Sequence, residues 1–150
     1  MRLVRQILPD AAAGVAVATR PEDLGVIRNP DVAAALWHRR PDPEFQAWID
    51  ALPPDQLPKA RVVLRPHDVT AAVTALCGAA GTPTGPARAR LIEDIAAQAT
   101  LFAGLMGAAF LRLRLDVIAH DACRKFHIDA ITARLICTYR GTGTQYGIST

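Results

Sequence analysis

The chain has 150 residues, of which 51% are hydrophobic, and this is enough to bury one core, so we expect a single domain over residues 1–150. Its formal net charge of +3 comes almost wholly from arginines spread along the chain, without the basic stripe that nucleic-acid binding needs. The absence of an apolar run of about eighteen residues excludes a membrane-spanning helix. Three widely spaced cysteines indicate reduced thiols rather than a disulfide framework.

Residues 1–18 show little pattern, and we expect them to form a poorly ordered leader. Arg2 and Arg5 resemble the start of a signal peptide, but Pro9 and Asp10 interrupt the apolar stretch that should follow. We therefore expect a cytoplasmic protein.

A short helix is predicted to start at residues 19–22, where a threonine cap, an early proline and a glutamate follow one another, and to end at Asn29. Residues 32–39 are ambiguous. Their three consecutive alanines favour a helix, whereas Leu36 and Trp37 could equally fill a buried strand. We favour the helix.

Three further helices are predicted from apolar residues at helical spacing. The first begins at Asp42 and stops at Pro53, and the second begins at Asp68 and closes near Gly78. The third, residues 87–106, has the clearest apolar stripe, with acidic residues on the opposite face.

After Met106 the period of the pattern changes from helical to alternating, which predicts strands at residues 111–117 and 133–140. The sequence therefore predicts an α+β fold, with a helical N-terminal two-thirds followed by a small antiparallel sheet. The strand edges are expected to stay open, and such edges favour a homodimer.

Between these two strands lies the segment richest in side chains that can bind metals. It contains His120, Cys123, His127 and Asp129 within ten residues. Imidazole and thiolate suit zinc, whereas histidine with a carboxylate also suits iron. These four residues are our candidate ligands for a divalent metal, Fe²⁺ or Zn²⁺.

In an extended backbone, His127 and Asp129 project from the same face, as two of the three ligands of a 2-His-1-carboxylate iron site do. Arg134 and Arg140, on the following strand, could hold an anionic co-substrate through a bidentate guanidinium.

An alternative remains open, because a histidine bonded to a nearby aspartate is common without a metal. In that interpretation His127 and Asp129 form a buried hydrogen-bonded pair, and the protein is a non-catalytic structural or protein-interaction module whose open sheet edge binds a partner. The sequence does not decide whether the protein is an enzyme.

The run of residues 113–116, 121–129 and 134–144 resembles a bacterial family known only as domain of unknown function 1826. Residues 36–39 and the helix around residues 91–102 resemble it as well, so the likeness covers most of the chain. Members of the family lie beside genes of metal-chaperone GTPases of the zinc-handling kind. The resemblance therefore implies a role in metal homeostasis and names such a GTPase as a possible partner.

More remotely, the order of strand, Phe-His-x-Asp and strand is similar to the first half of the double-stranded β-helix of iron- and 2-oxoglutarate-dependent oxygenases. This resemblance implies iron ligands at His127 and Asp129. Such enzymes take a second histidine and the co-substrate arginine from later strands, so the chain is expected to be truncated at Thr150, or to complete the site from elsewhere. 2-Oxoglutarate is implied only for a completed fold.

Overall fold

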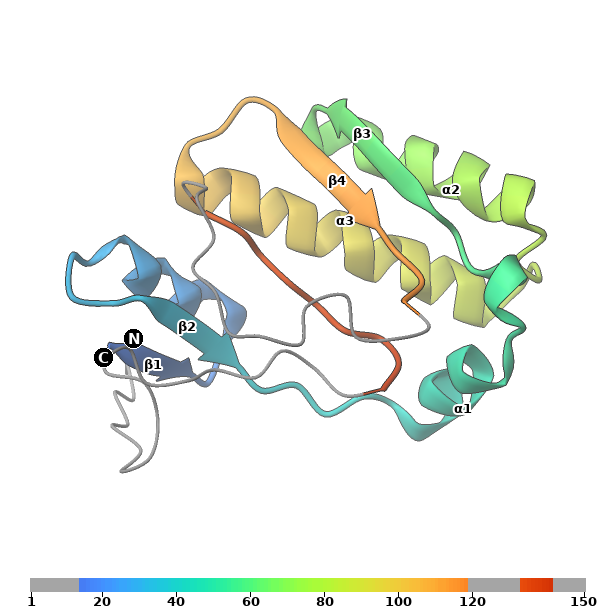
Figure 1. Cartoon of the computed structure of the whole chain (residues 1–150), viewed down its shortest axis with the longest axis horizontal. Coiled ribbons are helices and arrows are strands. Elements are labelled where there is room, and N and C mark those ends of the chain that lie inside the picture. Colours follow the sequence, from blue (N-terminus) through green and yellow to red (C-terminus); the bar gives the residue numbers. More distant parts are fainter. Residues whose placement is uncertain (1–13, 119–132, 142–150) are drawn as a thin grey trace.

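The computed structural model describes residues 14–118 and 133–141. In Figure 1 the helices α2 and α3 cover one side of the strands β3 and β4, while β1 and β2 lie at the far end of α3. The elements in chain order are β1 (Val15–Ala18), η1 (Pro21–Arg28), β2 (Ala34–Trp37), α1 (Pro43–Ala51), η2 (Pro54–Gln56), β3 (Ala60–Leu64), η3 (Pro66–Asp68), α2 (Val69–Ala80), α3 (Pro86–Met106) and β4 (Leu111–Leu115).

The fold class is α+β, as predicted, and it contains a small antiparallel sheet. That sheet pairs β3 with β4, so that Ala60 lies opposite Leu115 and Leu64 opposite Leu111. The chain passes through both long helices between these strands. The strand that pairs with β4 is therefore β3, which comes from the part of the chain before α2 that the sequence indicates to be mainly helical.

The helix predicted within residues 32–39 is wrong, because Ala34–Trp37 forms β2 and pairs in parallel with β1. The leader expected over residues 1–18 is also wrong for Val15–Ala18, which forms β1 and is largely buried. Alanines have high helix propensity, but the neighbouring strand supplies backbone hydrogen bonds and half-buries those of β2, and this tertiary pairing outweighs propensity.

The other helices begin where the sequence indicates. The Asp42 carboxylate accepts a hydrogen bond from the Phe45 backbone N–H at 3.1 Å, which caps α1. Helix α2 runs past Gly78 and ends at Gly81, whose φ of 76° lies in the left-handed region that favours glycine.

The main core lies between the β3–β4 sheet and the helices. Val69, Val73 and Cys77 of α2 are fully buried, and Leu91 of α3 is 1% exposed. Cys77 is thus a core residue. The buried members of this core are Phe45, Ile49, Leu64, Val69, Val73, Cys77, Leu91, Ile92, Ile95, Ala99, Ala103 and Leu111.

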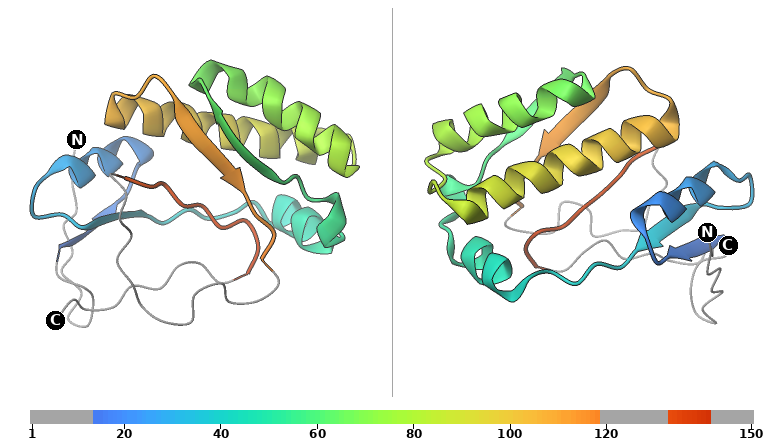
Figure 2. Two further views of the ribbon diagram at one scale, coloured as in Figure 1. Left: turned by 45° about the horizontal axis from the view of Figure 1, so that its top comes forward. Right: turned by 180° about the vertical axis from the view of Figure 1, so that it is seen from behind.

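Residues 133–141 cross the front of α3 in an extended conformation, in the space between β2 and β4 (Figures 1 and 2). The strand predicted here is wrong, since residues 133–141 form no strand. The alternation behind the prediction is present, however: Leu135, Cys137 and Tyr139 are half-buried, whereas Ile136 and Thr138 are exposed. The segment is anchored by side chains on one face.

Candidate functional site

The four predicted metal ligands, His120, Cys123, His127 and Asp129, lie outside the described residues. Within residues 14–118 and 133–141, no three histidine, cysteine or acidic side chains are grouped so that they could hold a metal ion. The predicted metal site therefore stays a prediction.

The two arginines predicted to bind an anion differ in their surroundings. The Arg140 Nη1 donates a hydrogen bond to the backbone carbonyl of Leu52 at 2.8 Å, which ties residues 133–141 to the end of α1. Arg134 is exposed. An anion-binding role for either residue stays a prediction.

A polar network centred on Asp94 joins α3 to the segment after β2 and to residues 133–141. Arg39 holds both Asp94 carboxylate oxygens, with N–O distances of 2.5 and 3.0 Å. Tyr139 donates its hydroxyl to Asp94 Oδ2 at 2.6 Å, and Gln98 donates its side-chain amide to the same oxygen at 2.8 Å. A second Arg39 contact, 3.1 Å to Sγ of Cys137, extends the network.

The ionisation of these groups reflects their mutual contacts. Burial acts to raise the pKa of Asp94, but the hydrogen bonds from Arg39 and Tyr139 outweigh it, so the pKa of this carboxyl is lowered. Burial, followed by the bond to the Asp94 carboxylate, raises the pKa of Tyr139 far above its usual range. Asp94 is thus held as a carboxylate and Tyr139 as a neutral phenol.

The network has the properties of a structural junction. The negative charge of Asp94 is balanced by Arg39 within the network. The Asp94 side chain is 27% exposed and that of Arg39 is 29% exposed. A pocket of about 220 Å³ lies beside it, lined in part by Trp37, Gln98 and Leu101. The charged groups at the pocket wall are already paired to each other, which leaves them little capacity to bind a charged ligand.

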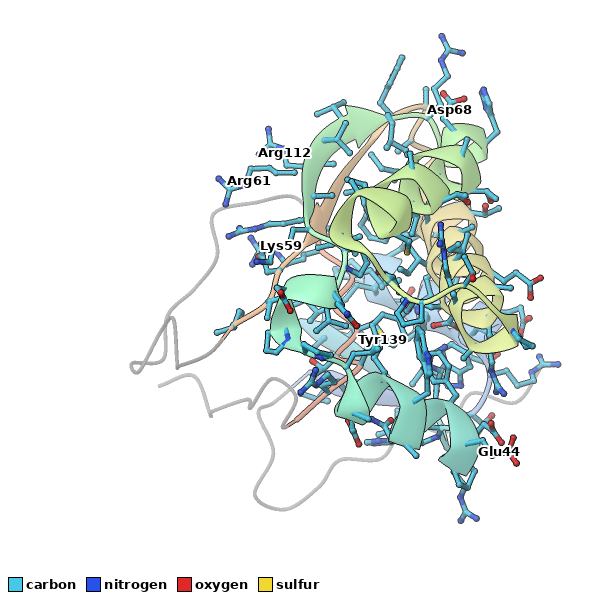
Figure 3. All side chains as sticks on the ribbon, turned by 90° about the vertical axis from the view of Figure 1, so that its right-hand side faces the viewer. Glu44, Lys59, Arg61, Asp68, Arg112 and Tyr139 are labelled. Atoms are coloured by element: carbon cyan, nitrogen blue, oxygen red, sulfur yellow. The ribbon has the colours of Figure 1, made fainter. Side chains whose placement is uncertain are left out.

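A second feature lies on the side of the β3–β4 sheet that faces away from the helices. Residues directly opposite each other in an antiparallel pair share one face of the sheet. Arg61 lies opposite Arg114, and Val63 lies opposite Arg112. We call these four residues, Arg61, Val63, Arg112 and Arg114, the arginine face. Figure 3 shows Arg61 and Arg112 projecting together from neighbouring strands, with Lys59 on the same side.

Like charges directly opposite each other destabilise a strand pair, so the arginine face is an unfavourable arrangement by itself. Arg114 is compensated by Asp116, with its Nε 2.7 Å from the carboxylate. Among the described residues, neither Arg61 nor Arg112 forms an ion pair. These two guanidinium groups can therefore accept an external anionic group.

A shallow surface depression lies at this place. It measures about 350 Å³ and is lined by Arg61, Val62, Val63 and Arg112. Val63 is 60% exposed and Val62 is 38% exposed, which is unusual for large apolar side chains in a sheet. The site thus combines apolar side chains, unpaired positive charge and a strand at the edge of its sheet.

Sequence reasoning recognised the alternation of leucine and arginine in residues 111–115 but missed the arginine face. The missing information was the partner strand, because β3 lies about fifty residues earlier in the chain and its register places Arg61 beside Arg114. The available signal was Arg61, a charged residue in the otherwise apolar run of residues 60–64.

The fold and the surface define this chain as an α+β protein with arginines on the outer face of a two-stranded sheet. It belongs to the family described as "Protein of unknown function (DUF1826)", whose profile matches residues 18–150. The likeness to oxygenases is not shown by this match. The searches of curated proteins and of solved structures returned no match. Within the described part of the chain, no helix is long and apolar enough to cross a membrane.

Proposed function

We propose that this chain is a protein-interaction module that accepts an extended partner segment along the free edge of β3. The observation that carries the proposal is that β3 pairs with β4 on one side only, in the described ranges, while its valines remain exposed. An edge strand presents unpaired N–H and C=O groups, and a partner strand can satisfy them.

The other strand of this sheet is protected in a way that β3 is not. On the side of β4 away from β3, residues 133–141 lie alongside and are fixed by Tyr139 and Arg140 (Figure 1). Helices α2 and α3 cover the inner side of the sheet. Among the elements that the structure describes, none covers the free edge of β3 or the outer side of the sheet.

The proposal is tested by selecting twelve-residue peptides from a random library on the full chain and measuring amide hydrogen exchange of the complex by NMR. We expect a selected peptide to slow exchange in β3. An added strand bonds to β3 along only one of its edges, so only every second peptide N–H takes part. We therefore compare two peptides, one N-methylated at its odd positions and one at its even positions. One of them should lose binding and the other should keep it. Binding that tolerates both N-methylated peptides, or that leaves β3 exchange unchanged, would contradict strand addition.

We also propose a second candidate function, divalent metal binding by His127 and Asp129 with Cys123 and His120 as further ligands. It is favoured by the density of metal-binding side chain types in this part of the sequence. The test is elemental analysis of the untagged protein. Stoichiometric Fe²⁺ or Zn²⁺ that is lost in a His127→Ala, Asp129→Ala variant would support it, and metal-free native protein would exclude it.

The chain offers a matched control for this experiment. His67 and Asp68 form an exposed pair with Nε2 and Oδ1 3.5 Å apart, and their side chains are 72% and 58% exposed. A His67→Ala, Asp68→Ala variant removes the same two residue types from a place outside the proposed site, so its metal content should not change.

A further inference from the structure

The chemistry of the arginine face indicates what the partner is. Resting on the strand-docking function proposed above, we infer that the occupant of the β3 edge is an acidic segment of another protein, with carboxylates at alternate positions, and not a second copy of this chain. The argument depends on which side chains of β3 share a face.

Side chains alternate along a strand, and a strand that joins the sheet keeps the same alternation. Arg61 and Val63 belong to the outer face, and by alternation the flanking Lys59 and Arg65 fall on the same side. All four are exposed, and Figure 3 shows Lys59 near Arg61. Three of these four outer positions, Lys59, Arg61 and Arg65, would therefore place positive charge beside alternate residues of an incoming strand.

The inner positions of β3 have the opposite character. Leu64 is buried in the core and Ala60 is half-buried, whereas Val62 is 38% exposed at the edge of the sheet. An incoming strand would place its other set of residues beside Val62, where apolar side chains would be favoured. A segment that alternates acidic and apolar residues matches both faces.

A second copy of this chain fits poorly at the same edge. If two copies of β3 joined as antiparallel strands around Val62, Lys59 would lie opposite Arg65 of the other copy. A pairing centred on Val63 would place Arg61 of one copy opposite Arg65 of the other. A pairing centred on Arg61 would place the two copies of Arg61 opposite each other. All three registers place like charges opposite each other, which is destabilising.

A nucleic acid would satisfy the guanidinium groups but not the rest of the site. Phosphates would leave the N–H and C=O groups of the β3 edge without a strand partner and would not cover Val62 and Val63. The four exposed cations of this face, Lys59, Arg61, Arg65 and Arg112, also supply few phosphate contacts. The combination of charge and strand edge therefore favours an acidic peptide.

The experiment uses the full chain and four fluorescent ten-residue peptides: alternating Glu-Val, alternating Gln-Val, alternating Lys-Val, and a peptide with the Glu-Val composition in which the five glutamates precede the five valines. Fluorescence anisotropy at fixed ionic strength gives each Kd. We expect the alternating Glu-Val peptide to bind at least about tenfold more tightly than the other three. Equal affinity for the Gln-Val peptide would overturn the inference and leave the proposed function standing, whereas failure of all four to slow exchange in β3 would count against the function itself.

Charge reversal supplies the second arm. An Arg61→Glu, Arg112→Glu variant should lose about tenfold affinity for the Glu-Val peptide and gain affinity for the Lys-Val peptide. The control variant Arg28→Glu, Arg40→Glu changes the net charge by the same amount at exposed residues outside β3 and β4, and it should leave both affinities unchanged. Equal losses in both variants would show a general charge effect and overturn the inference.

Two further measurements address the other occupants. Analytical ultracentrifugation should show a monomer at micromolar concentration, and a dimer that dissociates in a Val63→Lys variant would overturn the exclusion of a second copy. A twelve-nucleotide single-stranded DNA should compete weakly with the Glu-Val peptide. Tighter binding of that DNA would instead identify a nucleic-acid surface.

Discussion

Arg39 and Asp94 are 55 positions apart in the sequence, yet the guanidinium of Arg39 holds both carboxylate oxygens of Asp94. The pair connects the segment after β2 to the middle of α3. Tyr139 and Gln98 bond to the same carboxylate, so this one side chain fixes three parts of the chain.

We expect Asp94→Asn to lower the free energy of unfolding by about 2 kcal/mol, because it weakens a charge-assisted bidentate contact and two further hydrogen bonds. Urea denaturation followed by circular dichroism measures the change. Glu93→Gln is the matched control, since Glu93 is the exposed neighbour on the same helix, and it should change stability by less than about 0.5 kcal/mol. Equal effects would show that the network contributes nothing specific.

The lowered pKa of Asp94 predicts how this contribution depends on acid. A carboxyl whose folded pKa is below its unfolded value of 3.8 contributes stability above that value and loses it as the pH falls through the folded pKa. The stability difference between the wild type and Asp94→Asn should therefore be constant near neutral pH and narrow below pH 4. Urea midpoints at pH 7, 5, 4 and 3 test this. A difference that persists at pH 3 or widens there would contradict the assignment.

The raised pKa of Tyr139 predicts an effect of the opposite sign in alkali. A phenol whose folded pKa lies above the unfolded value of 10.0 contributes stability below pH 10 and loses it as the pH rises further. The advantage of the wild type over Tyr139→Phe should thus shrink between pH 9 and pH 11. Thermal melts across this range measure it, and the second tyrosine is common to both proteins.

Gly14 precedes β1 at a close approach of two backbones. A Cβ at this position would lie 2.7 Å from the carbonyl oxygen of Asp31, and φ is +85°. Gly81 provides the control, because its φ is +76° and no atom lies within 4 Å of a Cβ there. Gly81→Ala should cost about 1 kcal/mol from backbone strain alone, and Gly14→Ala should cost clearly more. Equal shifts in Tm would refute a steric role for Gly14.

The parts of the fold that the sequence predicts are those governed by local rules. The cap at Asp42 and the apolar stripe of α3 lie within one helix each, so their spacing alone defines them. β2 was misassigned because its alanines favour helix and only the pairing with β1 selects a strand. Local preference is weak when a partner strand can supply hydrogen bonds.

The site depends on contacts that local patterns do not contain. Asp94 reads as a solvent-facing acid on the polar side of α3, and nothing near it in the chain indicates Arg39 or Tyr139. The arginine face likewise requires the register of β3 against β4.

The long sequence separations within the Asp94 network also set an order for folding during synthesis. Helices α2 and α3 can pair as soon as both have left the ribosome, because their contacts are close in the chain. Asp94 meets Tyr139, 45 positions later in the chain, and Arg39 meets Cys137 only after residues 133–141 have been translated. Until residues 133–141 are added, part of the core beside α3 lacks the cover that Tyr139 gives it, and such transiently uncovered apolar surface makes a nascent chain prone to aggregate.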